Sequence, residues 1–100
     1  MATDVTSDPG VLILVSLAGG QKHGHAMLLD IEAFAGRRLG PGTLYGALSR
    51  LEAAGYVEAL EPAGRRRPYR LTREGRFELR KRLGRLAVAV RIGRQRLAPT

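Results

Sequence analysis

Apolar positions recur at helical spacing in several segments of the chain, and turn-forming residues separate these segments. The first segment, residues 11–17, is almost wholly apolar. Asp8-Pro9 before it suits an N-cap and a first helical turn, and Gly19-Gly20 follows it. These flanks predict a short buried helix, although the β-branched residues in the segment would also suit a strand.

The next two helices are predicted after a turn at residues 21–24. Residues 25–35 place Leu28, Ile31 and Ala35 on one face of a helix. The following helix should begin at Pro41 and end near Ala54, because proline is favoured in the first helical turn and Gly55 follows. Its apolar side is expected to be buried and comprises Leu44, Leu48 and Leu51.

The pattern then changes to short strands. Residues 56–60 alternate between apolar and polar side chains and carry aromatic and β-branched residues, which predicts a strand. Turn-forming residues follow at 62–64, and residues 69–71 form a return strand. The triple-arginine run Arg65–Arg67 therefore lies near the tip of a β-hairpin.

The last helix is expected over residues 73–97, with Thr72 as its cap. Its apolar residues follow the spacing of a coiled-coil seam, with Gly93 filling one position. The seam is longer than a compact domain of this size needs to cover, so we predict a homodimer; the alternative is that it covers its own domain. Val88 and Ile92, off the seam, should meet the first helix. The seam residues are Leu79, Leu83, Leu86, Val90 and Leu97.

Together these elements predict a mainly α fold with a small β-hairpin. A three-helix core, a two-stranded wing and a long C-terminal helix form a winged helix-turn-helix. We expect residues 1–72 to form the core unit and residues 73–100 the dimerisation helix, within one compact domain. A chain of 100 residues is long enough for one such core. Residues 1–7 are expected to fray.

The charge of the chain indicates a polyanionic partner. The formal net charge is +8, made up of −3 in residues 1–62 and +11 in residues 63–100. Three adjacent guanidinium groups at a hairpin tip repel one another and add nothing to a core, so we expect Arg65–Arg67 to contact phosphate. A solvated charge run is the alternative.

The third helix is the candidate reader of double-stranded DNA. We place Thr43, Ala47 and Arg50 on its outer side, with two glycines alongside that allow close approach to a duplex. Tyr45 is expected to contact a phosphate or pack beside the wing. The predicted DNA-binding residues are Arg37, Arg38, Gly42, Thr43, Tyr45, Gly46, Ala47, Arg50, Arg65, Arg66 and Arg67.

Other kinds of chemistry find little support in the sequence. There is no cysteine, and His23 and His25 have no acidic or thiol neighbour to complete a metal site. No catalytic arrangement is present, so we expect no enzyme activity, cofactor or metal. The apolar run at residues 11–15 is too short to span a membrane, which predicts a cytoplasmic protein. The second functional hypothesis is a winged-helix module that binds RNA or an acidic protein without reading a DNA sequence.

The chain resembles the PadR-like family of bacterial transcriptional regulators. The motifs are residues 22–25, the segment 41–45 (PGTLY), residues 48–52 and 55–58, and the segment 69–75 containing YRLT and Gly75. The resemblance covers about residues 10–90. Gly40 departs from the polar cap usual before the proline, and His25 from the usual aromatic residue.

The resemblance implies a repressor that binds a palindromic operator as a homodimer. The proline-led helix would enter the major groove, and Tyr45 would lie by the DNA backbone. The last helix would pack against the partner's N-terminal helix, which adds Val11 and Leu14 to the expected dimer interface. Residues 86–90 carry no aromatic side chain, which argues against a flat drug bound between subunits; a different small-molecule effector stays open.

Overall fold

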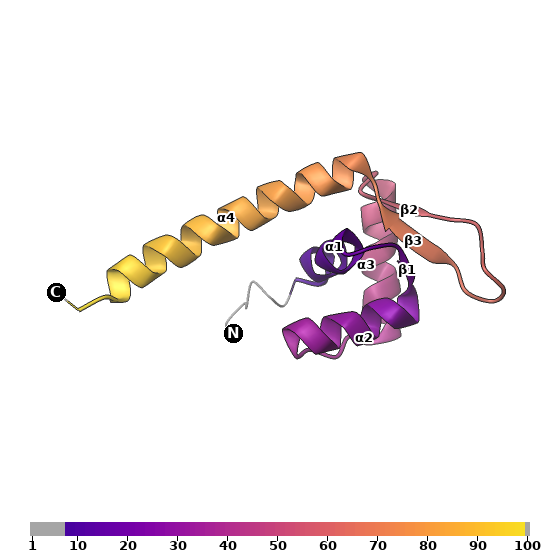
Figure 1. The fold of residues 1–100 in the computed structure, drawn as a ribbon, viewed down its shortest axis with the longest axis horizontal. Coiled ribbons are helices and arrows are strands. Elements are labelled where there is room, and N and C mark those ends of the chain that lie inside the picture. The colour runs from indigo at the N-terminus through magenta and orange to yellow at the C-terminus, as the bar shows by residue number, and fades with distance from the viewer. Residues whose placement is uncertain (1–7, 100) are drawn as a thin grey trace.

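The computed structural model describes residues 8–99, so the segment expected to fray at residues 1–7 lies outside it. Helices α1 to α3 form a compact bundle, a small antiparallel sheet lies beside it, and α4 crosses over the bundle and runs on past it (Figure 1). The elements in chain order are α1 (Pro9–Ala18), β1 (Lys22–His23), α2 (Gly24–Ala35), α3 (Pro41–Ala53), β2 (Val57–Ala59), β3 (Pro68–Leu71) and α4 (Arg73–Leu97).

Helix α1 lies at the centre of the core. The Asp8 carboxylate accepts a hydrogen bond from the Gly10 backbone N–H at 2.9 Å, and Pro9 occupies the first turn. This capping explains why the segment forms a helix, although its β-branched residues would also suit a strand. The helix is buried along most of its length because α2, α3 and α4 all pack against it.

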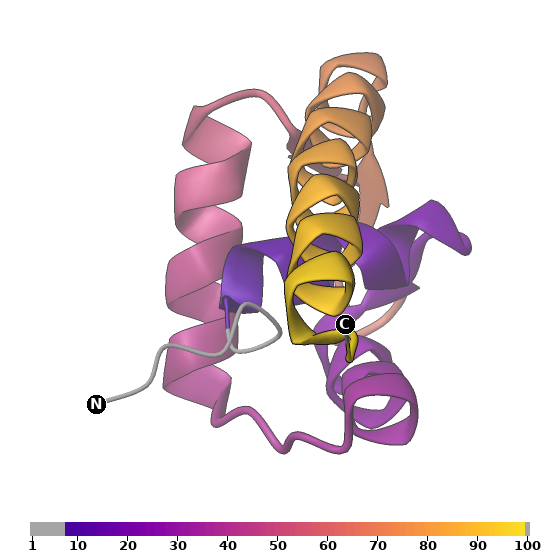
Figure 2. The same cartoon turned by 90° about the vertical axis from the view of Figure 1, so that its left-hand side faces the viewer.

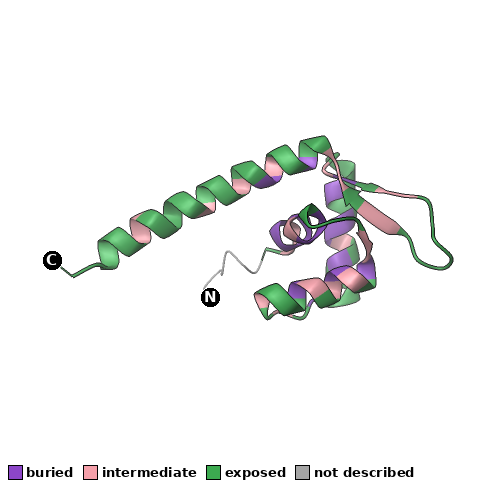
Figure 3. Ribbon diagram, in the orientation of Figure 1, coloured by how far each residue is buried: buried purple, intermediate pink, exposed green. Residues whose placement is uncertain are grey.

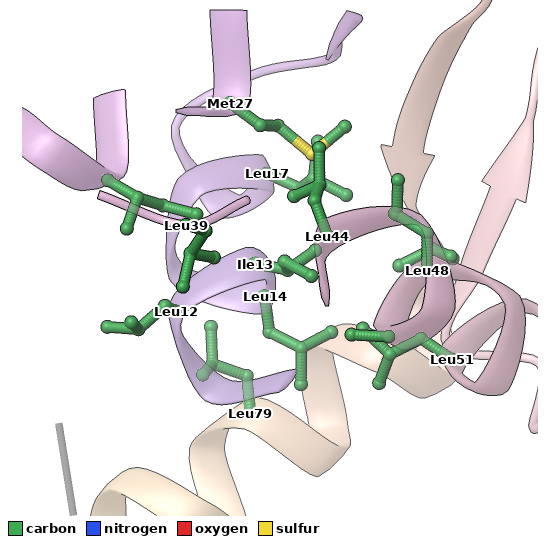
Figure 4. Close-up of a cluster of buried hydrophobic side chains, with 13 residues drawn as sticks. Leu12, Ile13, Leu14, Leu17, Met27, Leu39, Leu44, Leu48, Leu51 and Leu79 are labelled. Carbon is green, nitrogen blue, oxygen red and sulfur yellow. The ribbon is translucent and has the colours of Figure 1, made fainter. Parts of the chain in front are cut away.

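The core is built from side chains that converge on α1 (Figure 4). The leucines predicted for the buried face of α3 are all present in it, and α2 contributes Met27 and Ile31. Figure 3 shows that burial is concentrated in the helical bundle, whereas most of α4 is exposed. The fully or nearly fully buried members are Leu12, Ile13, Leu14, Leu17, Met27, Ile31, Leu39, Leu44, Ala47, Leu48, Leu51, Val57 and Leu79.

The sheet has a third strand that the sequence did not predict. Residues 21–24 were expected to be a turn, but Lys22 and His23 form β1, which pairs antiparallel with β3 at Tyr69 and Pro68. The strand order is β1-β3-β2. A strand of two residues has no periodic signal of its own. It exists because its partner, far along the chain, is folded back beside it.

Lys22 links α1 to this sheet. Its ammonium donates hydrogen bonds to the backbone carbonyl oxygens of Ser16 and Gly20 at the end of α1. The buried Ser16 hydroxyl donates to Asp30 of α2 at 2.7 Å. Lys22 therefore adds side-chain hydrogen bonds to carbonyl groups at the C-terminal end of α1, where the Ser16 carbonyl also accepts the Gly19 N–H at 3.2 Å. Its place in the sequence motif thus has a structural explanation.

The junction between the sheet and α4 is fixed by Thr72 and Gly75. The Thr72 hydroxyl donates to the Gly55 carbonyl at 2.6 Å and accepts from the Gly75 N–H at 2.9 Å. A Cβ atom on Gly75 would lie 1.9 Å from the Tyr56 carbonyl oxygen, so the helix approaches the backbone of the preceding turn as closely as glycine allows. Both features account for the Leu-Thr-x-x-Gly motif.

Helix α4 extends well beyond the core (Figure 1), and Figure 2 looks along this helix from its C-terminal end. The longest dimension of the molecule is 59 Å, against 26 and 22 Å for the others. Of the two residues predicted to meet α1, Val88 is 47% exposed and Ile92 is half-buried. Among residues 8–99, no helix combines the length and apolar character needed to cross a bilayer.

Candidate nucleic-acid interface

Helix α3 presents a small and polar face to solvent. Gly42 and Ser49 are exposed, Gly46 is half-buried, and a Cβ atom on either glycine would meet no backbone within 4 Å. These residues lie opposite the buried leucines because successive residues of a helix are about 100° apart. Ser49 was missing from the predicted set, although its spacing from Gly42 and Gly46 is that of one helix face.

The prediction that Ala47 contacts DNA is wrong. Only 2% of this residue is exposed, and it belongs to the hydrophobic core. Ala47 lies three residues after Leu44 and four before Leu51, so it borders the apolar side of the helix. Its spacing from Thr43 and Arg50 suggested an outer position, but that line of residues runs along one edge of the buried face.

Tyr45 and Arg50 lie on different flanks of the outer face. Tyr45 faces the wing, the hairpin of residues 57–71, and 48% of it is exposed. Arg50, also exposed, lines a separate hollow with Asp8, Gly10 and Arg82. The structure therefore brings Tyr45 together with the wing and keeps Arg50 away from it.

Gly24 creates the space that Tyr45 occupies. A Cβ atom at Gly24 would lie 2.3 Å from the Tyr45 hydroxyl oxygen. The phenol therefore rests directly against the first turn of α2. This contact fixes the direction of the Tyr45 side chain and accounts for glycine after His23.

The tip of the wing is a tight turn that points arginine side chains into solvent. Ala63 and Arg66 exchange backbone hydrogen bonds of 2.7 and 3.2 Å, which leaves Gly64 and Arg65 as the turn. Gly64 has φ of 65°, a left-handed conformation suited to glycine. Arg65, Arg66 and Arg67 are all exposed, as predicted.

These three arginines differ from the arginine in the strand that follows. Arg70 pairs with Glu58 on the neighbouring strand, with 3.0 Å between nitrogen and oxygen. Within residues 8–99, no carboxylate forms an ion pair with Arg65, Arg66 or Arg67. Their positive charge is thus available to an external anion.

The wing, α3 and the start of α2 enclose a hollow of about 220 Å³, which we call the wing hollow. Its lining contains no carboxylate among the described residues. Burial raises the pKa of the Tyr69 phenol, the negative charge of Glu52 raises it further, and the positive charge of Arg67 opposes this. Tyr69 is therefore a neutral hydroxyl at physiological pH. The lining residues are His23, Gly24, His25, Tyr45, Arg65, Arg66, Arg67 and Tyr69.

His23 makes two contacts that the sequence did not reveal. Its Nδ1 accepts the Ala26 backbone N–H at 3.3 Å and so caps α2, while its Nε2 lies 3.1 Å from Arg66 Nη1.

Arg37 and Arg38 lie in the loop before α3, and Arg38 is 3.5 Å from Glu32. In the part of the chain that the structure describes, no group of three or more histidine, cysteine or acidic residues could hold a metal ion.

The expected dimer residues fall into two groups. Val11, Leu14 and Leu79 are buried in the core of their own protomer, so their assignment to a dimer interface is wrong. Leu83, Val90 and Leu97 are exposed, and Leu86 is half-buried. Spacing placed the α4 residues on one seam, and the resemblance added Val11 and Leu14, but the first turns of α4 use that seam to cover α1.

Sequence comparison identifies a family. The sequence model of the "Transcriptional regulator PadR-like family" matches residues 13–81. The chain is 54% identical over 71 residues to an uncharacterised 37.1 kDa protein in a transposon of Streptomyces fradiae. This match covers 71% of the chain and 21% of the relative, so the chain spans about a fifth of that protein's length.

Structural comparison supports the same fold. A transcriptional regulator from Clostridium thermocellum superposes with a TM-score of 0.83 at 24% identity, covering 98% of this chain and 99% of the other. A PadR family transcription regulator from Clostridium difficile gives a TM-score of 0.80 at 22% identity, covering 90% and 98%. At these identities the likeness concerns the winged-helix fold.

Proposed function

Because this chain belongs to the PadR-like family of transcriptional regulators, we propose that it binds double-stranded DNA as a homodimer and represses transcription from an inverted-repeat operator. Regulators of this family are DNA-binding proteins rather than enzymes. On this proposal, residues 1–72 supply the DNA-binding unit and residues 73–100 the dimerisation helix. The protein would act in the cytoplasm.

The main support for this proposal is that two features predicted to bind DNA line the same cavity. Tyr45 of α3 and the three arginines of the wing line the same hollow. A helix that enters a groove and a wing that grips the adjacent backbone must act on one stretch of duplex. Their proximity favours a single continuous interface.

The outer face of α3 suits the major groove. Its small residues, Gly42, Gly46 and Ser49, allow the backbone to approach base edges closely, and Thr43 adds a hydroxyl. Arg50 on one flank is long enough to reach a guanine or a phosphate. The wing arginines then contact the backbone or a narrow minor groove. Arg37 and Arg38 would add backbone contacts before the helix.

The exposed apolar stripe of α4 supports a dimer. Leu83, Leu86, Val90 and Leu97 lie on one face of the helix and, unlike Leu79, are not used by the core. A second copy would bury them. Two-fold symmetry of the dimer would be matched by an inverted repeat, with half-sites about one helical turn, roughly 34 Å, apart.

Selection of bound duplexes from a random pool tests this proposal. We expect enrichment of a palindrome and a footprint with two-fold symmetry. Bound duplexes without any shared sequence would overturn operator recognition and favour the alternative of RNA or an acidic protein as the partner. A palindrome bound by one protomer would overturn the dimer.

Repression is tested separately by transcription in vitro. The selected palindrome is placed across the start site of a constitutive promoter, and a scrambled sequence serves as the control. We expect the transcript to fall as protein is added only with the palindrome. A rise in transcript would contradict repression while leaving DNA binding intact.

A further inference from the structure

We propose that one backbone phosphate of the duplex is held between His23 and Arg66 in the wing hollow. His23 is then a DNA-binding residue that links the cap of α2 to the wing. This inference rests on the proposed DNA binding and assigns a phosphate contact within that interface.

The two ring nitrogens of His23 both face N–H groups. Nδ1 lies 3.3 Å from the Ala26 backbone nitrogen, and Nε2 lies 3.1 Å from Arg66 Nη1. A neutral imidazole has one acceptor nitrogen and one N–H, and a guanidinium has no acceptor. The ring therefore cannot accept both hydrogen bonds.

The helix cap decides which contact is satisfied. The Ala26 N–H belongs to the first turn of α2 and has the ring nitrogen as its capping acceptor. With Nδ1 accepting, the proton of the neutral ring is on Nε2. The Nε2–H group then points at an arginine that also can only donate, so this pair lacks an acceptor.

An anion at this position supplies the missing acceptor. A phosphate oxygen can accept from His23 Nε2–H and from the Arg66 guanidinium together, and charge-assisted bonds of this kind are strong. The other arginines of the wing hollow and the Tyr45 hydroxyl add donors, and no carboxylate in the described lining competes. Phosphate from a duplex or free in solution meets the same donors.

The position of His23 in the sheet gives the contact its register. His23 pairs with Pro68 of β3, directly after the wing arginines, and Tyr45 lies against the neighbouring Gly24. A phosphate held by His23 and Arg66 is therefore fixed relative to α3. A phosphate bound at this point would therefore orient α3 in the major groove.

His23→Asn is the variant that separates the cap from the phosphate contact. Asparagine is a good N-cap for the Ala26 N–H but is too short to reach Arg66. With a duplex of random sequence as the probe, we expect affinity to fall about tenfold. The slope of log K against log salt should stay near the wild-type value, because a neutral ring releases no counterion. Circular dichroism and thermal melting establish that the variant folds.

Two further variants complete the test. Arg66→Gln should cause a similar loss of affinity and should also make the salt slope shallower by about 0.9. The double variant should bind no more weakly than either single variant, because both residues hold one phosphate. Arg70→Gln is the matched control, since Arg70 is already paired with Glu58 and lies outside the lining of the wing hollow; its affinity and salt slope should be unchanged. Wild-type affinity in His23→Asn, or additive losses in the double variant, would overturn the inference.

The source of the phosphate is resolved by NMR of the His23 ring nitrogens. A saturable shift with inorganic phosphate, abolished in Arg66→Gln, would show a site that also takes free phosphate; a shift with duplex alone would assign it to DNA. No shift with either probe contradicts the inference. Because the probe has random sequence, a missing palindrome preference would overturn the proposed operator but not this contact. Failure of the wild type to bind any duplex would overturn both.

Discussion

At the scale of single residues, several motif positions owe their identity to close contacts rather than to DNA. Gly24 leaves room for the Tyr45 phenol, and Gly75 lets α4 approach the Tyr56 carbonyl. Lys22 donates hydrogen bonds to backbone carbonyls at the end of α1. These residues organise the interface without belonging to its contact surface.

Gly75→Ala should destabilise the fold. The added Cβ would lie 1.9 Å from a backbone oxygen, which cannot move aside as a flexible side chain can. We expect a loss of about 2–3 kcal/mol in the free energy of unfolding, measured by denaturant titration. Gly84→Ala is the control on the same helix, with nothing within 4 Å of the new methyl group, and should stabilise by up to about 1 kcal/mol. Equal effects of the two changes would contradict the close-approach explanation.

Arg50→Ala should relax sequence preference. If the guanidinium reads a base edge, discrimination at one position of the selected palindrome should fall by about 1–3 kcal/mol. Competition binding with single-base variants of that palindrome measures this. An equal loss of affinity for every duplex would instead assign Arg50 to a phosphate.

At the scale of elements, the proposed DNA interface of α3 and the wing has two unlike flanks. Tyr45 faces the arginine tip, whereas Arg50 lies on the far side of α3 near Arg82. The wing is held in place by β1 and by the Glu58–Arg70 pair. On the proposed function, contacts with the DNA backbone are therefore made on the wing side of α3.

Replacing Arg65, Arg66 and Arg67 with glutamine should weaken binding to all duplexes alike. Each phosphate contact that is lost reduces the salt slope by about 0.9, so the slope should fall by up to about three. Fluorescence anisotropy across a salt series measures this. Arg70→Gln is the control, because that arginine is already paired with Glu58. An unchanged slope in the triple variant would remove the wing from the interface.

The stability of the fold should depend on pH through Glu78 of α4. The hydrogen bond from Arg82, at 2.8 Å, lowers the pKa of this carboxyl, and the charges of Arg82, Lys81 and Arg85 act in the same direction, against an opposing effect of burial. A pKa lowered by folding stabilises the folded state above the unfolded pKa, and this contribution is lost as pH falls through the folded pKa. Glu78→Gln should therefore reduce the loss of stability below about pH 4.3, measured by thermal melting from pH 7 to pH 3. Parallel curves for the two proteins would contradict this role.

At the scale of the whole molecule, α4 reaches past the core that its first turns help to form. Leu79 is buried against α1, while Leu83, Val90 and Leu97 on the same face are exposed. The start of this face therefore packs against its own protomer, whereas these later residues are exposed. That continuation is the basis for the proposed dimer.

Leu86→Glu should convert the proposed dimer into monomers. A carboxylate placed in the apolar seam would have to be buried without a partner. Analytical ultracentrifugation measures the change. Val88→Glu, about 200° around the helix from Leu86, is the matched control and should leave the dimer intact. A dimer that survives Leu86→Glu would require a different interface.

The sequence by itself determined the helices, the hairpin and the family. Caps at Asp8 and Thr72, the proline at 41 and the leucine spacing of α3 are local signals, and each acts on neighbouring residues through backbone hydrogen bonds or side-chain direction. These signals place α4 at residues 73–97, as observed.

Only the tertiary structure decided which apolar residues the core would use and which groups would meet across the chain. Ala47 and Leu79 have the spacing of outer and seam positions, but packing against neighbouring helices buries them. The pairing of His23 with β3, and its contact with Arg66, depend on residues far apart in sequence being folded side by side. Periodicity fixes the direction of a side chain around its own helix, whereas burial depends on what packs against that side.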